Sequence, residues 1–122
     1  MSNPDFLILY VKDLPKSIEF YKSTFAQEPV NQSPGFAMFV LPNGLKFGLW
    51  LAGTAEPEVE TAGGGAEYGI PLADAGGLNQ AHEASLTLGH KIIQNPTEMS
   101  FGLTYVVEDP DRHRIRYYVP AA

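Results

Sequence analysis

The sequence predicts an α+β fold built from two copies of one strand-helix-strands unit, because two patterns each occur twice along the chain. In Tyr105–Val119, an apolar run leads to Pro110 and a turn-forming residue, and a second run of alternating character follows. Phe36–Trp50 has the same layout around Pro42. The two segments are therefore interpreted as equivalent strand hairpins.

The second repeated pattern is a short apolar strand that ends at an aspartate, which opens a helical pattern. Phe6–Leu14 and Glu67–Ala75 both have it. The offset is 67 − 6 = 61 residues for these strands and 110 − 42 = 68 residues for the two prolines, a difference that loop length absorbs. The two alignments pair Phe6 with Glu67, and Gly48 with Arg116.

Length and composition indicate one globular domain. With 122 residues, 44% hydrophobic and 18% charged, the chain can bury one core but not two large independent ones. We expect a single domain, 1–122, with half-units at about 5–51 and 66–119 and a linker at 52–65. The linker is small and acidic and contains three consecutive glycines, so we expect it to be mobile or to cover a site as a flap.

Charge and missing residue types exclude several functions. A formal net charge of −6 without a basic cluster argues against nucleic acid and membrane as partners. The chain has no cysteine, which excludes disulfides, thiolate catalysis and cysteine-bound metals. It also lacks a leader pattern, a membrane-spanning apolar stretch, a Ser-His-Asp arrangement and a phosphate loop. We expect a cytoplasmic protein, and we predict no catalytic residue and no cofactor.

The first half-unit should contain one helix and four strands. Phe6–Val11 is a buried strand, and Asp13 caps a helix that runs from about Leu14 to Thr24. A short strand is predicted at Gln27–Asn31, and two further strands flank the turn at Pro42.

The second half-unit should repeat this order. Glu67–Leu72 is predicted as a strand, and Asp74 caps a helix that stops at Gly89. Lys91–Gln94 is predicted as a short strand followed by a loop at 95–97, and the closing hairpin completes the sheet.

Several of these motifs together resemble a known family. Tyr10–Leu14 followed by Ser17–Tyr21, with Glu108–Asp111 before Ile115, resembles the vicinal oxygen chelate superfamily. That superfamily includes glyoxalase I, extradiol dioxygenases, and the fosfomycin- and bleomycin-resistance proteins. The resemblance spans essentially the whole chain, and the stretch 25–47 is similar to the phenazine-antibiotic-resistance branch.

The resemblance implies paired βαβββ modules whose curved mixed sheets form a cup, usually completed in a homodimer. In metal-dependent members, four inward positions hold the ion. These positions correspond to Phe6, Gly48, Glu67 and Arg116, the same four that the internal repeat pairs.

The residues at these four positions argue against a metal. A divalent ion needs converging His nitrogens or carboxylate oxygens, and only Glu67 supplies one. The guanidinium of Arg116 remains protonated and repels a cation. We therefore predict a charge-assisted ion pair between Glu67 and Arg116 in place of the ion. For His82, His90 and His113, a surface position is favoured over a ligand role.

Alternation along the strands extends the predicted site, because neighbouring side chains point to opposite faces of a sheet. For Phe6, Phe39 and Phe101, the sequence does not decide between contact with a ligand and a place in the core. The predicted ligand-binding residues share an inward position or an aromatic ring: Phe6, Ile8, Tyr10, Phe39, Gly48, Trp50, Glu67, Phe101, Tyr105, Arg114, Arg116 and Tyr118.

An aromatic surface with guanidinium groups favours flat organic anions as ligands. The leading hypothesis is a metal-free, non-catalytic homodimer that sequesters a planar aromatic antibiotic or metabolite, as drug-resistance members of the resembling family do. The alternative is a metal-dependent lyase or dioxygenase of the glyoxalase type. It would need Glu67 to be joined by Glu98, Glu108 or His113.

Overall fold

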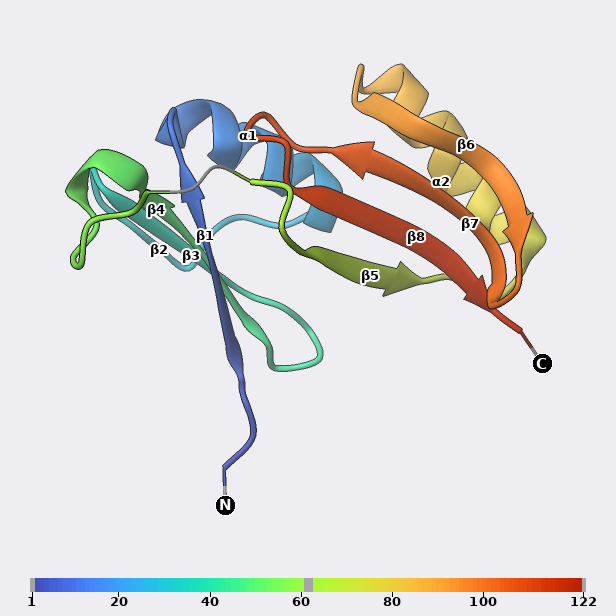
Figure 1. Ribbon diagram of the computed structural model, residues 1–122, viewed down its shortest axis with the longest axis horizontal. Coiled ribbons are helices and arrows are strands. Elements are labelled where there is room, and N and C mark those ends of the chain that lie inside the picture. Colours follow the sequence, from blue (N-terminus) through green and yellow to red (C-terminus); the bar gives the residue numbers. More distant parts are fainter. Residues whose placement is uncertain (1, 61–62, 122) are drawn as a thin grey trace. The chain divides into compact units, whose positions relative to one another are not determined.

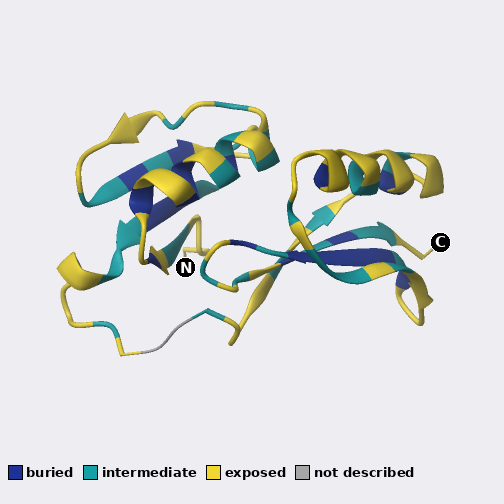
Figure 2. Ribbon diagram, turned by 90° about the horizontal axis from the view of Figure 1, so that it is seen from above, coloured by how far each residue is buried: buried dark blue, intermediate teal, exposed yellow. Residues whose placement is uncertain are grey.

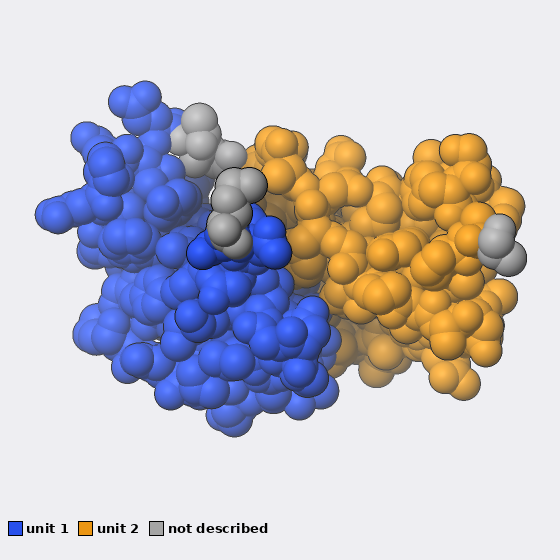
Figure 3. Space-filling view, turned by 90° about the horizontal axis from the view of Figure 1, so that it is seen from below, with its two compact units in different colours: residues 1–62 blue, residues 63–122 orange. Residues whose placement is uncertain are grey.

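The computed structural model describes residues 2–60 and 63–121 and divides into two compact units, residues 1–62 and 63–122 (Figure 3). Each unit contains a four-stranded mixed sheet and one α-helix (Figure 1). The predicted α+β fold of two βαβββ modules is confirmed. Within the described ranges, no helix has both the length and the apolar character needed to cross a membrane.

The elements of unit 1 follow the predicted order. They are β1 (Phe6–Val11), α1 (Leu14–Phe25), β2 (Asn31–Gln32), β3 (Phe36–Val40), β4 (Lys46–Leu51) and a 3-10 helix, η1 (Ala52–Thr54). The sheet order is β1-β4-β3-β2, with β1 parallel to β4. The strand predicted at 27–31 is wrong. Strand β2 begins only at Asn31, the last residue of the predicted range, because Pro29 has no N–H group to donate to a ladder.

Helix α1 begins and ends where its capping residues dictate. The Asp13 carboxylate accepts the Lys16 N–H at 3.1 Å, and Pro15 occupies the first turn, where its missing N–H costs nothing. The helix ends at Phe25, and its C-cap residue, Ala26, adopts a left-handed conformation with φ of 52°. It buries Leu14, Ile18 and Tyr21 against the sheet.

Aromatic rings fill the core of unit 1. The ring centroids of Tyr21 and Phe47 are 4.9 Å apart, and Phe25 lies 4.9 Å from Phe47 and 5.6 Å from Phe39. Phe39 is 0% exposed. The prediction that Phe39 contacts a ligand is therefore wrong. It pairs with Phe47 across the β3–β4 hairpin and shares the face that α1 covers.

Unit 2 repeats the arrangement, with its last three strands longer than those of unit 1. Its elements are β5 (Glu67–Pro71), α2 (Ala75–Thr87), β6 (Lys91–Met99), β7 (Gly102–Glu108) and β8 (Arg114–Pro120). The sheet order is β5-β8-β7-β6, with β5 parallel to β8. The loop predicted at 95–97 is wrong, because β6 continues through it with register shifts between Ile92 and Gln94 and between Gln94 and Thr97.

Helix α2 forms despite two glycines in its first turn. The carboxylate of its N-cap residue, Asp74, accepts the N–H of Gly77 at 2.8 Å. This bond satisfies a donor that the helix itself leaves free, which offsets the low helix propensity of the glycines. At the other end, Gly89 has a φ of 74° and turns the chain toward β6.

The core of unit 2 contains a stacked tyrosine pair. The rings of Tyr105 and Tyr117 are 4.6 Å apart and nearly parallel, and the Tyr105 hydroxyl lies 2.9 Å from the Ser85 hydroxyl of α2. The His82 ring packs edge-on against Tyr105 at 5.2 Å. Burial raises the pKa of both tyrosine hydroxyls. The ligand-contact role predicted for Tyr105 and the solvated position predicted for His82 are therefore wrong, since both rings pack between α2 and the sheet.

The strand registers show that the internal repeat is structural. In each unit the first strand pairs in parallel with the last. Residues of the first strand of unit 2 lie 61 positions after their counterparts in unit 1, and residues of its last strand lie 68 positions after theirs, as predicted. The equivalent pairs are Phe6 with Lys46 and Glu67 with Arg114, then Ile8 with Gly48 and Gly69 with Arg116.

Candidate functional site

Each sheet has a face covered by its helix and an opposite face, which we call the open face. The buried residues gather between helix and sheet, and the outer sides of the helices are exposed (Figure 2). Because side chains alternate, the strand registers define both open faces. The open face of unit 1, the aromatic face, carries Phe6, Ile8, Tyr10, Phe36, Met38, Lys46, Gly48 and Trp50. The open face of unit 2, the polar face, carries Glu67, Gln94, Thr104, Val106, Glu108, Arg114, Arg116 and Tyr118.

Two phenylalanine rings cover the glycine of the aromatic face. A Cβ on Gly48 would lie 2.9 Å from the Phe36 ring and 3.0 Å from the Phe6 ring. The space above Gly48, one of the predicted ligand-binding positions, is therefore filled by the protein's own rings in this conformation. Phe6 nevertheless remains 39% exposed, so its outer face is available for stacking.

Trp50 extends the same aromatic surface along β4. Its ring lies 6.0 Å from Tyr10 at 36° and 6.1 Å from Phe36 at 88°. The half-buried Trp50 and the exposed Tyr10 therefore present a continuous edge of π-systems. The ammonium of Lys46 lies 5.9 Å from the centroid of Phe6 and pairs with Asp5 at 3.4 Å.

Arg116 organises the polar face. Its Nε donates to the Glu67 carboxylate at 2.6 Å, and its Nη1 donates to Gln94 Oε1 at 3.1 Å and to Thr104 Oγ1 at 3.2 Å. The predicted ion pair between Glu67 and Arg116 is confirmed. The guanidinium carbon also lies 5.5 Å from the ring centroid of Phe101, in the turn before β7. Arg116 is thus held on three sides and is neutralised by one carboxylate.

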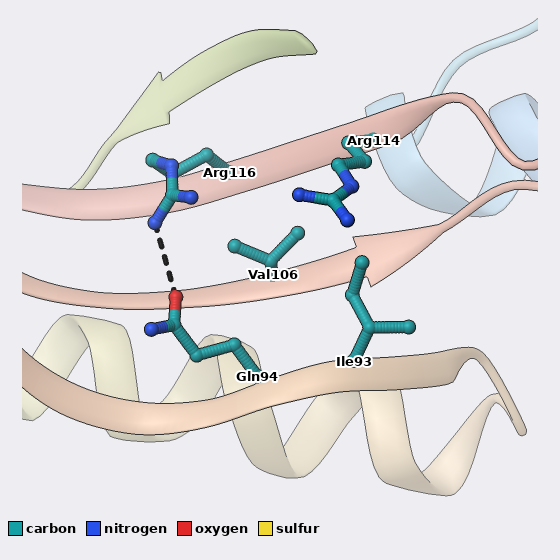
Figure 4. Close-up of a pocket in the computed structure, with 5 residues that line it drawn as sticks. All are labelled: Ile93, Gln94, Val106, Arg114 and Arg116. Atoms are coloured by element: carbon teal, nitrogen blue, oxygen red, sulfur yellow. Dashed lines mark hydrogen bonds between the residues drawn. The ribbon is translucent and has the colours of Figure 1, made fainter. Parts of the chain in front are cut away.

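A pocket of about 230 Å³ opens beside this cluster (Figure 4). Ile93 and Gln94 of β6 and Val106 of β7 form its apolar and amide walls, and Arg114 and Arg116 of β8 bring guanidinium groups to it. Figure 4 shows both arginine side chains reaching over the neighbouring strand, with Val106 between them. The pocket therefore combines an apolar floor with two cationic groups.

The positions that hold a metal in related proteins do not fit a divalent ion in this chain. Phe6 and Gly48 have no donor atoms, and Arg116 supplies a positive charge of its own. Two of the three residues named as partners of Glu67 in the enzymatic alternative are engaged elsewhere: Glu108 pairs with Lys91 at 3.1 Å, and His113 bonds to Asp109 at 2.8 Å. Across residues 2–60 and 63–121, no three His, Cys, Asp or Glu side chains gather as a metal site requires.

The histidines are less exposed than predicted. The His113 ring is held by the buried carboxylate of Asp109, which also accepts the N–H groups of Asp111 and His113 in the β7–β8 turn. His90 is partly buried after α2, and this burial lowers its pKa. The prediction of surface histidines is therefore wrong for His113 and His82, both of which are part of the packing.

The structure brings most of the predicted residues to the open faces of their own units and adds several that sequence reasoning missed. Phe36, Met38 and Thr104 could have been found from the hairpin register, since each faces a predicted residue across β3–β4 or β7–β8. Gln94 had no such signal. In a regular strand counted from Lys91 it would point toward α2, and only the register shift of β6 turns it to the open face.

Comparisons with known proteins agree with this architecture. The family model described as the Glyoxalase/Bleomycin resistance protein/Dioxygenase superfamily matches residues 3–117. The phenazine antibiotic resistance protein EhpR of Enterobacter agglomerans is 31% identical over 116 residues, which cover 93% of this chain and 88% of that protein. The resemblance predicted from the motifs is thereby confirmed.

Solved structures show the same fold. A protein of Agrobacterium tumefaciens solved by solution NMR is 40% identical, with a TM-score of 0.91 over 100% of both chains. A glyoxalase/bleomycin resistance protein/dioxygenase from Nocardioides is 24% identical, with a TM-score of 0.83 over 98% of this chain and 85% of that one. With the family match, the repeat and the paired modules, the chain belongs to the glyoxalase/bleomycin resistance/dioxygenase superfamily.

Proposed function

We propose that this protein is a metal-free binding protein that sequesters a planar aromatic anion, as an antibiotic-resistance protein would. The observation that carries the proposal is the aromatic face of unit 1, where the rings of Tyr10, Phe36 and Trp50 adjoin one another and remain partly open to solvent. The similarity of the chain to a phenazine antibiotic resistance protein supports the same class of ligand.

Stacking explains why such a face suits a flat molecule. Each well-oriented ring pair contributes about 0.5–1.5 kcal/mol beyond the burial of apolar area. Phe6 and Tyr10 are 39% and 38% exposed, so the aromatic face offers ring surface for a second aromatic system to stack on. A planar ligand would cover these rings without a change in the fold.

Unit 2 has a feature of its own that favours anions, the guanidinium groups of its polar face. The whole chain is acidic, with a formal net charge of −6, so its field repels anions in general. A local pair of arginines in a pocket that also contains Ile93 and Val106 offsets this repulsion and favours anions that carry an apolar part.

Trp50 provides a direct test, since it is the only tryptophan of the 122 residues. Titration with phenazine-1-carboxylate should quench its fluorescence in a saturable way, and chromatography should recover the compound unchanged. Replacement of Trp50 by alanine should weaken binding about 5- to 20-fold, measured by calorimetry, because one stacking partner is lost. The conservative Trp50→Phe variant should retain most of the affinity.

Two results would contradict the proposal. One is the absence of both quenching and binding heat across a panel of planar aromatic anions. The other is the appearance of a product, which would indicate catalysis. Lys12→Ala, at an exposed position after β1, serves as a matched surface control.

The proposal includes a homodimer. In the described part of each unit the sheet leaves two edge strands, β1 and β2 in unit 1 and β5 and β6 in unit 2. Unpaired edges offer hydrogen-bonding groups to a second chain. Sedimentation equilibrium at micromolar concentration should give twice the mass of the 13.3 kDa chain. A single species of monomer mass would contradict this part of the proposal.

A further inference from the structure

The two arginines of the pocket differ in how many partners they have. Arg116 bonds to Glu67, Gln94 and Thr104, and its guanidinium packs near Phe101. Arg114 is exposed, and it makes no side-chain hydrogen bond or ion pair with any residue that the structure describes. The pocket therefore has one satisfied guanidinium and one with its donors available.

The strand register makes this difference unexpected. Arg114 directly faces two carboxylate residues, Glu67 on β5 and Glu108 on β7. Opposite charges in such cross-strand positions normally pair. Here Glu67 instead bonds to Arg116 at 2.6 Å, and Glu108 bonds to Lys91 at 3.1 Å. Both nearby anions are thus engaged by other cations, and Arg114 remains the uncompensated charge of this face.

We infer that Arg114 is the carboxylate-binding residue of the polar face. Its guanidinium presents paired N–H donors that match a carboxylate in a bidentate geometry. Ile93 and Val106 give the pocket apolar side chains, against which the apolar part of a carboxylate ligand can pack. Arg116 acts as a positioning residue, because its bond to Gln94 fixes one wall of the pocket.

Charge and size define the ligand class further. Arg114, Arg116 and Glu67 together carry one net positive charge, which matches a monoanion better than a dianionic phosphate. A volume of about 230 Å³ lies below the range of about 300–1,000 Å³ that holds whole drug-sized ligands. The pocket therefore suits a carboxylate and the ring edge that bears it. Only the aromatic part of this ligand rests on the proposed function; the contact between Arg114 and a carboxylate does not.

Arginine side-chain NMR tests the assignment with benzoate as the probe. The Nε–Hε signal of Arg114 is the one that is missing from the spectrum of Arg114→Gln. In the wild type this signal should shift in a saturable way when benzoate is added, and the Arg116 signal should shift much less. Benzamide, the neutral analogue, should leave both signals in place. Arg114→Gln should weaken benzoate binding at least tenfold, measured from signals of neighbouring backbone amides.

Arg112→Gln is the matched control, since it removes the same charge from an exposed residue of the same hairpin. It should change benzoate affinity less than twofold. Equal losses in both variants would show a general charge effect and overturn the inference. A saturable shift of Arg116 alone, or no shift of any arginine signal, would overturn it as well.

The outcomes separate this inference from the proposed function. If benzoate shifts Arg114 while planar aromatic anions leave Trp50 unquenched, the anion site stands and the proposed function fails. If those compounds quench Trp50 while benzoate shifts no arginine signal, the proposed function stands and the anion site fails. Circular dichroism of the Arg114→Gln variant should match the wild type, because the side chain has no hydrogen-bond or ion-pair partner among the described residues.

Discussion

Replacement of Gly102 by alanine is expected to destabilise unit 2 by more than about 3 kcal/mol. Gly102 is the buried first residue of β7 and has a φ of 134°, a backbone conformation that residues with a side chain rarely adopt. An added Cβ would run into the carbonyl oxygen of Val119 on the paired strand β8. The position of a Cβ is fixed by the backbone, and the Val119 carbonyl belongs to the backbone of a paired strand, so neither group can rotate away. Urea denaturation followed by far-UV circular dichroism measures the effect.

Gly53→Ala is the control for this prediction. Gly53 lies exposed in η1, and a Cβ there would meet no atom within 4 Å. Its stability should change by less than about 0.5 kcal/mol. A Gly102→Ala protein as stable as this control would mean that the turn between β6 and β7 has a different backbone.

Phe39→Ala is expected to cost about 3–5 kcal/mol, the range for removing a fully buried aromatic ring. The ring is 0% exposed and packs edge-on against Phe25 of α1. The surrounding aromatic rings are rigid, so a cavity would remain where Phe39 was. The shift of the urea midpoint at unchanged slope gives the loss of stability.

Val40→Ala tests whether burial causes this loss. Val40 is the next residue of β3, but it is 39% exposed. Its replacement should cost less than about 1 kcal/mol. Similar losses in the two variants would contradict the core position of Phe39. A Phe39→Ala protein of normal stability that binds planar aromatics more weakly would restore the ligand-contact role that the sequence predicted.

The sequence was sufficient to predict the elements whose signals are local. Asp13 with Pro15 marked the start of α1, and Asp74 marked the start of α2 in spite of its glycines. The repeat was predictable because both units keep the same parallel pairing of first and last strands. The Glu67–Arg116 pair was predicted because the family resemblance places these two oppositely charged residues among the four inward positions that hold a metal in other members.

The errors at Phe39 and Tyr105 have one physical cause. Alternation predicts which residues share a face only after the register of a hairpin is known, and a slip of one residue inverts every side chain. The turn after β3 is closed by bonds from Gly44 to Leu41 and from Leu41 to Leu45. This geometry pairs Phe39 with Phe47, and it was not evident from a proline-asparagine-glycine sequence alone.

Side-chain conformation limited the prediction at Gly48. A glycine among aromatic residues predicts open space, but the sequence does not indicate whether neighbouring rings fold into that space. Here the Phe6 and Phe36 rings do so. Rotation of a ring about its χ angles depends on packing in three dimensions, which the pattern of residue types does not encode.

The register shift beside Ile93 makes this point of β6 tolerant of changes in chain length. Ile92 pairs with Val107 and Gln94 with Val106, so Ile93 is a surplus residue in the ladder. Loss of its codon would close the bulge and leave the flanking pairs in place, yet it would remove one wall of the pocket. A lineage could thus enlarge or reshape the cavity by a three-nucleotide deletion, without any substitution among the charged residues.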